Sequence, residues 1–200
     1  MKHLSICLVA LVAMLGACSR PFTPAERALI SGADSLMNVC VLPQDSVVLR
    51  AVSADFGPRE LASPLLRSLI DKMLYTVQDP SQDGVGIAAP QVGINRRLVC
   101  VQRFDKPGEP FEAYVNIQID SLIGQLVPGR EGCLSVSGLR GIVPRYPTVV
   151  ISYLQPGAGS EDRVSERVEG FTAVIFQHEC DHLDGVLYID KATELFAVEE

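Results

Sequence analysis

The chain of 200 residues has no tryptophan and only three histidines, and no internal repeat is visible in it. The missing repeat excludes a solenoid or an array of small units. His3 lies close to the N-terminus, so His178 and His182 are the only histidines of the remaining chain. A site built from three imidazoles is therefore excluded, and any metal held by this pair needs another kind of ligand.

Basic residues are also scarce. The sequence has 17 lysines and arginines against 24 aspartates and glutamates, a formal net charge of −7. Without residues 1–17 it loses Lys2 and no acid, so 16 basic and 24 acidic residues leave a charge of −8. This balance excludes a protein that holds nucleic acid through phosphate contacts. The remaining length of about 180 residues is that of one domain, and we expect a monomer.

Long apolar runs are missing except near the N-terminus. Residues 4–15 follow Lys2 and are too few to span a membrane, which is typical of a secretory signal. Leu15-Gly16-Ala17-Cys18 then has the pattern of a bacterial lipobox. We expect residues 1–18 to be a lipoprotein signal, with Cys18 lipidated and the protein facing the periplasm from the cell envelope. This lipid would be the only contact with the membrane.

Two alternatives remain for the leader. It can act as an ordinary signal peptide or as an uncleaved anchor. An unused leader would leave the protein in the cytoplasm.

Cysteine occurs six times, but no compact disulfide framework is visible. Outside the leader and the lipobox the sequence has Cys40, Cys100, Cys133 and Cys180. Their spacings of 60, 33 and 47 residues match no small disulfide scaffold. We therefore expect at least one of them to be a metal ligand.

Residues 177–185 contain the pattern H-E-x-x-H. His178 and His182 are four residues apart, so on a helix both imidazoles lie on one face and can share a metal ion. Glu179 lies beside them, where a carboxylate can act as a general base on a water molecule. The apolar residues 171–176 indicate a buried helix, and Gly185 is typical of a helix end.

The rest of the chain predicts two further helices. Thr23-Pro24-Ala25-Glu26 is a capping box that begins a short helix. Ser63 and Pro64 begin a longer one, whose apolar residues follow a helical stripe as far as residue 74.

Extended segments surround these helices. They are predicted at residues 47–50, 98–104, 111–119, 121–127, 142–154 and 163–169. The order predicts an α+β fold, with antiparallel β-sheets packed around a central H-E-x-x-H helix. We expect residues 19–43 to be a tether with one short helix, residues 44–192 to be the catalytic domain, and residues 193–200 to be a short C-terminal tail.

Residues 84–91 are a candidate for ligand contact. Their small residues allow the backbone to come close to a ligand, and the run ends on Gln91. Gly84-x-Gly86-x-x-Ala89 alone would also suggest a dinucleotide site. It follows a polar loop, however, and Pro90 breaks the helix that such a site requires.

Residues 131–135 are a second candidate. Glu131-Gly132-Cys133-Leu134-Ser135 offers the Cys133 thiolate as a third metal ligand, with Gly132 allowing close approach. From chemistry alone, Cys133 and an acidic residue are equal candidates for this position.

Residues 84–91, 131–135 and 177–182 together resemble the motifs of peptide deformylases, which occur in the same order. The resemblance extends over roughly residues 45–190. It implies an α+β hydrolase that removes the N-formyl group from peptides beginning with formyl-methionine and releases formate. It also implies one divalent metal. Ferrous iron is the first candidate for this metal, and zinc, nickel or cobalt are alternatives.

The same resemblance implies the roles of the matching residues. Cys133, His178 and His182 would hold the metal, and Glu179 would move the proton of the attacking water. The Gln91 side chain and the Leu134 backbone N–H would stabilise the developing oxyanion.

Substrate binding is implied for four residues: Val85, Gly86, Gly132 and Arg140. The Gly86 backbone would pair with the peptide as an added strand. Val85, Leu134 and the helix face near Cys180 would line the methionine pocket. Arg140 would support the loop that follows the cysteine.

Other functions fit parts of the pattern. A zinc metallopeptidase would also use H-E-x-x-H, with Glu194 as the only third ligand in reach. A lipid-anchored binding or scaffold protein would keep only the metal site. Glu179 and Gln91 are not needed to bind a metal, so their presence argues against this function.

Two features depart from the family pattern. One is the leader itself, and the other is residues 137–141, which lack the proline that often follows the cysteine motif.

Overall fold

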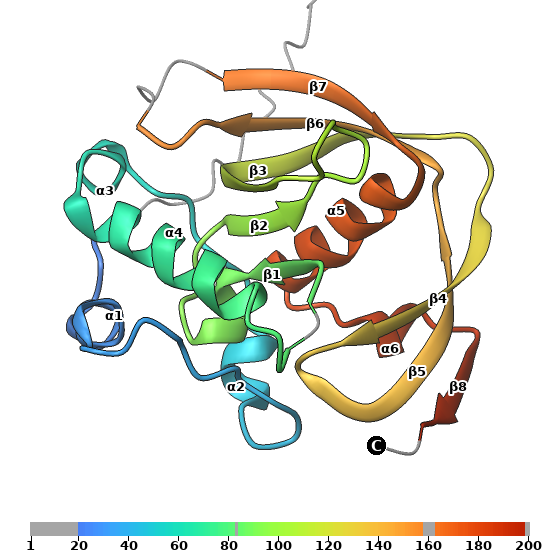
Figure 1. Ribbon diagram of the computed structural model, residues 1–200, viewed down its shortest axis with the longest axis horizontal. Coiled ribbons are helices and arrows are strands. Elements are labelled where there is room, and N and C mark those ends of the chain that lie inside the picture. Colours follow the sequence, from blue (N-terminus) through green and yellow to red (C-terminus); the bar gives the residue numbers. More distant parts are fainter. Residues whose placement is uncertain (1–19, 83, 158–162, 199–200) are drawn as a thin grey trace, which may run out of the picture.

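The computed structural model describes residues 20–82, 84–157 and 163–198. Two sheets lie on either side of a central helix, α5 (Figure 1). The larger sheet has the strand order β1-β2-β3-β6-β7 and the smaller one β4-β5-β8, and every pairing between named strands is antiparallel. The predicted α+β fold is confirmed.

The strands are β1 (Gly86–Ala88), β2 (Leu98–Gln102), β3 (Phe111–Ile123), β4 (Val127–Cys133), β5 (Val136–Arg145), β6 (Thr148–Leu154), β7 (Arg163–Glu169) and β8 (Glu194–Ala197). The helices are α1 (Pro24–Ser31), α2 (Ser46–Leu49), α3 (Pro58–Leu61), α4 (Pro64–Val77), α5 (Gly170–Leu183), α6 (Tyr188–Lys191) and a 3-10 turn, η1 (Ala89–Val92).

Two predicted helices begin at their predicted caps. The Thr23 hydroxyl accepts a hydrogen bond from the Glu26 N–H (3.1 Å), and the Glu26 carboxylate accepts one from the Thr23 N–H (2.7 Å). The Ser63 hydroxyl accepts a hydrogen bond from the Leu65 N–H (3.2 Å). Both starts could be predicted because these bonds join residues close together in the sequence.

The apolar core has two main layers. Leu69 and Met73 of α4 pack with Ile87 of β1 and Leu98 of β2. Residues of α5, including Phe176, pack with the inner strands of the larger sheet in the second layer. Because α5 is buried on nearly all sides, its polar side chains lie inside the protein, where each needs a polar partner.

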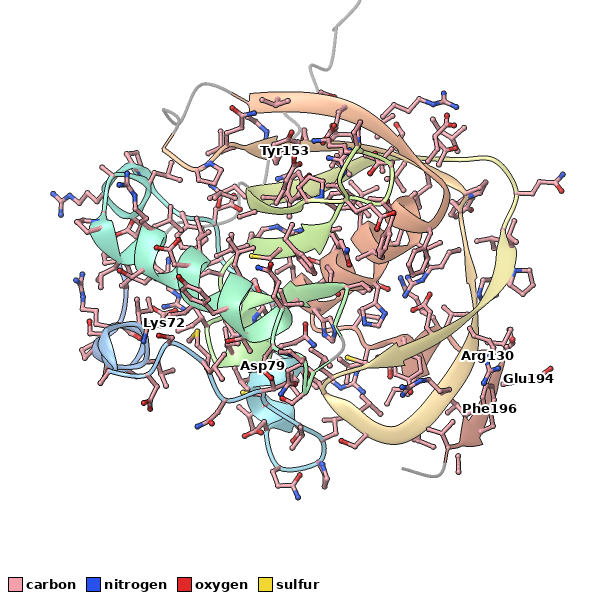
Figure 2. All side chains as sticks on the ribbon, viewed as in Figure 1. Lys72, Asp79, Arg130, Tyr153, Glu194 and Phe196 are labelled. Carbon is pink, nitrogen blue, oxygen red and sulfur yellow. The ribbon has the colours of Figure 1, made fainter. Side chains whose placement is uncertain are left out.

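The part of the expected tether that the structure describes is packed against the domain. Phe22 and Ile30 are buried in the same core layer as α4. Lys72 of α4, labelled in Figure 2, donates hydrogen bonds to the backbone oxygens of Gly32 and Asp34 (both 2.7 Å). The expectation of a tether is therefore wrong for residues 20–34, because Phe22 and Ile30 join the core.

Three other expectations need correction. Residues 47–50 fall largely within α2 instead of an extended segment, because backbone bonds back to residues 45 and 46 close a helical turn. Residues 111–123 form one strand, β3, whose register shifts at two irregular points. The expected C-terminal tail contains β8, which pairs with β5. Within the described residues, no helix combines the length and the apolar character needed to cross a membrane.

Candidate active site

Helix α5 positions the three residues of the H-E-x-x-H pattern. It carries His178, Glu179 and His182, all of which are buried. The chain leaves the helix through Gly185, which has a φ of +72° and lies against the Arg50 carbonyl, where a Cβ would overlap. Only glycine fits this exit, as the sequence predicted.

The third predicted ligand comes from the smaller sheet. Cys133 ends β4, and its Sγ lies 3.2 Å from His182 Nε2. One ligand atom from each of Cys133, His178 and His182 lies within 4.8 Å of the others. Ligands at about 2.0–2.3 Å from a tetrahedral ion are separated by comparable distances. This geometry favours Cys133 over an acid, and Glu194 lies in the separate strand β8.

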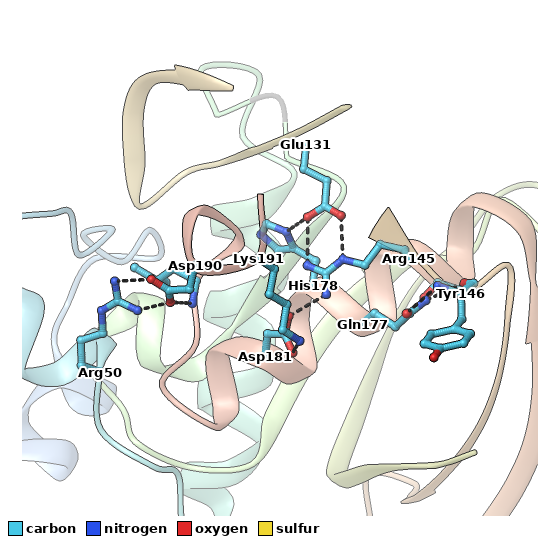
Figure 3. Close-up of polar contacts among 11 residues, drawn as sticks. Arg50, Glu131, Arg145, Tyr146, Gln177, His178, Asp181, Asp190 and Lys191 are labelled. Atoms are coloured by element: carbon cyan, nitrogen blue, oxygen red, sulfur yellow. Dashed lines mark hydrogen bonds and ion pairs between the residues drawn. The ribbon is translucent and has the colours of Figure 1, made fainter. Parts of the chain in front are cut away.

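Glu131 orients one of these ligands. His178 Nδ1 lies 2.8 Å from Glu131 Oε2, which leaves Nε2 free for a metal. Arg145 donates hydrogen bonds to both Glu131 oxygens (2.7 and 3.0 Å) and to Asp181 (2.6 Å). Figure 3 shows this chain of contacts. Burial alone would raise the pKa of Glu131, but the hydrogen bonds from His178 and Arg145 hold this pKa below its usual value.

Sequence reasoning gave Glu131 no role. It is 47 residues from His178, so no local spacing could indicate the contact. A buried carboxylate behind a metal-binding imidazole fixes the tautomer and the orientation of the ring. The arrangement therefore fits a metal ligand better than a structural histidine.

Glu179 lies against strand β1. A Cβ on Gly86 would lie 2.6 Å from Glu179 Oε1, so the close packing of β1 on α5 requires glycine. Burial raises the pKa of Glu179 to about 7, and the nearby Glu131 charge adds to this shift. Glu179 Oε2 is buried without a protein partner among the described residues. Such an atom fits a site that holds a cation and water.

Gln91 is held by the turn that carries it. Its Oε1 accepts a hydrogen bond from the Ala88 N–H (2.8 Å), which fixes the amide. Its Nε2 then lies 3.6 Å from Cys133 Sγ and 3.3 Å from Ser135 Oγ. An amide donor is thereby fixed beside the proposed metal ligand.

A cavity of about 270 Å³ joins these groups. Its lining includes the predicted residues Val85, Gly86, Gln91, Gly132, Cys133, Leu134, Arg140, His178 and Glu179. Ligand pockets commonly measure roughly 300–1,000 Å³, so this one suits a small group. His182 lies behind the lining, beside Cys133.

The helix face at the cavity differs in one respect from the expectation. Phe171, Val174 and Ile175 line it, whereas Cys180 packs into the core below the larger sheet. Cys180 follows Glu179 directly, and the turn of about 100° per residue directs its side chain away from the cavity.

Two imidazoles and a thiolate beside a buried carboxylate, at the wall of one cavity, are characteristic of metal-dependent hydrolases.

Comparisons with known proteins identify the family. Residues 36–197 match the family model described as polypeptide deformylase. "Peptide deformylase" from Leptospira biflexa is 38% identical over 170 residues, which cover 80% of this chain and 92% of the relative. "Peptide deformylase 2" from Bordetella bronchiseptica is 42% identical over 139 residues, which cover 66% and 76% of the two chains. The chain belongs to the polypeptide deformylase family.

Solved structures agree with this assignment. The Met-Ala-Ser-bound class I type b peptide deformylase from Acinetobacter baumannii matches with a TM-score of 0.69 at 35% identity, covering 78% of this chain and 98% of that one. An actinonin-bound peptide deformylase from Synechococcus elongatus matches with a TM-score of 0.70 at 32% identity, covering 82% and 84%.

Proposed function

We propose that this chain hydrolyses the N-formyl group of peptides that begin with formyl-methionine, releasing formate. The observation that carries the proposal is the meeting of Cys133, His178 and His182 beside Glu179, at a cavity that Cys133, His178 and Glu179 line, in a deformylase-family fold. The test is formate release from formyl-Met-Ala-Ser by residues 19–200, purified without oxygen and loaded with ferrous iron or nickel. Turnover is expected, and a fully metallated protein without turnover would contradict the proposal.

Cys133, His178 and His182 would hold one divalent metal. When bound, this ion supplies the Lewis acidity that polarises a carbonyl and makes a water molecule more acidic. A thiolate makes the site softer than a carboxylate would, and we assign it to ferrous iron, with zinc, nickel and cobalt as alternatives. Metal analysis of protein purified without oxygen distinguishes them.

The residues of the chain would perform the proton transfers and stabilise the charge. Glu179 takes a proton from the attacking water and later gives it to the leaving amine. The Gln91 Nε2–H and the Leu134 backbone N–H donate hydrogen bonds to the oxygen on which negative charge develops. Gln91 needs no rearrangement for this, because its Oε1 is already bound to the Ala88 N–H.

The peptide would bind as an extra strand beside Gly86, since β1 is at the edge of the larger sheet and, among the described residues, pairs with β2 alone. Val85 and Leu134 would contact the methionine side chain, and Gly132 and Arg140 would line the path of the following residues. We also propose that the protein is a monomer, and light scattering of the purified protein tests this.

The lipid anchor at Cys18 is also a proposal. Arg96, fully buried, donates hydrogen bonds to the backbone oxygens of Arg20 and Pro21 (the latter 2.7 Å). The packed domain thus extends to Arg20, two residues after Cys18. Two residues of fully extended chain span at most about 7 Å. A lipid on Cys18 would hold the enzyme directly at the periplasmic face of a membrane. Mass spectrometry of the mature N-terminus tests this, and an intact Met1 in a cytoplasmic fraction would contradict it.

A further inference from the structure

The rim of the active-site cavity carries two arginines, Arg130 on β4 and Arg140 on β5. Both are exposed. Among the described residues neither forms an ion pair, and Arg140 Nη1 donates only to the Leu139 backbone oxygen (3.0 Å). Both guanidinium groups are therefore free to bind an anion.

The register of the smaller sheet brings the two arginines to one face. Arg130 pairs with Ile142 across β4 and β5, and Arg140 pairs with Phe196 across β5 and β8. Ile142 and Arg140 are two residues apart, so all four side chains share a face. Gly132, two residues from Arg130, belongs to the same face and borders the cavity.

Both guanidinium groups are positioned by contacts that do not neutralise them. The Arg130 guanidinium lies 5.0 Å from the centre of the Phe196 ring, a cation–π contact made by the C-terminal strand. Figure 2 shows Arg130, Glu194 and Phe196 together beside β8. The Arg140 guanidinium packs against the Gly132 backbone. A Cβ placed on Gly132 would lie 2.5 Å from Arg140 Nε.

The acidic residues of the cavity do not offset these charges at the rim. Glu131 is buried and bound to Arg145 and His178, and Glu179 lies against α5 and β1. Glu194 lies in the same cross-strand row as Arg130, with Ile142 of β5 between them, and among the described residues it makes no ion pair with Arg130. Among the described residues that line the cavity, Arg130 and Arg140 are therefore the exposed charged ones, in a protein with a net charge of −7.

The geometry points to Arg130, with Arg140, as a specificity determinant for peptides that carry a carboxylate at the third residue. Arg130 precedes Cys133 by three residues, about 10 Å along a strand. An extended substrate beginning at the metal ligands covers the same distance in about three residues. The carboxylate can come from an acidic side chain or from the C-terminus of a tripeptide. This inference rests on the proposed function.

Four peptides separate these two sources. Formyl-Met-Ala-Ser with a free C-terminus is compared with its C-terminal amide, and formyl-Met-Ala-Glu amide with formyl-Met-Ala-Gln amide. Each carboxylate peptide is expected to have a kcat/KM about fivefold above its neutral partner at low salt, falling toward equality in about 1 M NaCl. Equal values for both pairs at low salt would overturn the inference.

Variants assign the effect to residues. Arg130→Gln should remove most of the preference, and Arg130→Lys should retain part of it, while kcat/KM for the neutral peptides stays near the wild-type value. Phe196→Leu should weaken the preference without changing the charge, as expected of a positioning residue. Arg167→Gln, an exposed change on β7, is the matched control and should leave the preference intact.

Binding provides a readout independent of turnover. Calorimetry with the product peptides Met-Ala-Glu amide and Met-Ala-Gln amide should show the same preference and the same loss in Arg130→Gln. A protein that binds these peptides selectively but releases no formate would support this inference and contradict the proposed function. A preference that survives in Arg130→Gln would contradict the role of Arg130.

Discussion

At the scale of single residues, the site depends on side chains that support the metal ligands. Glu131 bridges His178 and Arg145, and Arg145 continues to Asp181. Because these groups are buried together, the loss of one leaves another without its partner. The orientation of His178 therefore depends on Glu131, which is not one of the three proposed metal ligands.

Glu131→Gln should lower metal affinity about 10- to 100-fold, because the amide cannot accept at both positions with a full negative charge. Competition with a chelator measures this directly. Glu169→Gln, an exposed change on β7, serves as the control. Unchanged affinity in Glu131→Gln would show that His178 is held by other contacts.

At the scale of elements, the close packing of β1 against α5 sets the shape of the cavity. The two elements meet where Gly86 contacts Glu179 and Ile175, within 2.9 Å of a Cβ placed on Gly86. In the proposed binding mode, the same strand would offer its free edge to the peptide. A shift of β1 would therefore disturb both the proton-transfer residue and the substrate.

Gly86→Ala should lower kcat/KM by roughly 100-fold, as expected when reacting groups are displaced by about 1 Å. Steady-state formate release measures the loss. Gly129→Ala on β4 is the control, because a Cβ there meets nothing within 4 Å. Full activity of Gly86→Ala would rule out tight packing of β1 on Glu179.

Elements marked by local signals could be predicted, and elements defined by distant partners could not. The caps at Thr23 and Ser63 and the apolar run of α5 lie within a few residues of the structure that they determine. The strand β8 exists because β5 presents an edge about 55 residues earlier in the chain. The four-residue helix α2 is too short to have a periodic pattern.

The residues of the candidate site divide in the same way, into those marked by local motifs and those defined by distant contacts. Short motifs and the family resemblance indicated the residues that meet at the cavity. The supporting contacts of Glu131 and Phe196 join segments far apart in sequence. Phe196, for example, lies 5.0 Å from the guanidinium of Arg130, which is 66 residues earlier in the chain. No spacing in the sequence indicates such pairs.

At the scale of the whole molecule, a buried ion pair fastens the N-terminal helix to the domain. Both Glu26 oxygens accept hydrogen bonds from Arg96 (3.1 Å each), whose guanidinium also lies over the Phe22 ring at 5.1 Å. Burial alone would raise the pKa of Glu26, but the bonds from Arg96 and the Thr23 N–H hold it below its usual value of 4.5.

Glu26→Gln should lower the free energy of unfolding by about 3 kcal/mol at pH 7, because Arg96 would stay buried without its counter-charge. The pKa of Glu26 is lower in the folded protein than in the unfolded chain. Its contribution to the free energy of unfolding is therefore complete above pH 4.5 and is lost as the pH falls toward the folded pKa. Urea unfolding should thus show a gap between wild type and variant that narrows in acid. Glu109→Gln, at an exposed position, is the control, and a gap independent of pH would contradict this account.

The most direct test of the central claim compares wild type and Glu179→Ala at equal metal content, with formate release from formyl-Met-Ala-Ser as the readout. The account predicts rapid release by the wild type and a loss of roughly 10²–10⁴-fold in the variant, which keeps its metal ligands. A fully metallated Glu179→Ala protein with wild-type activity would contradict the assignment of proton transfer to Glu179.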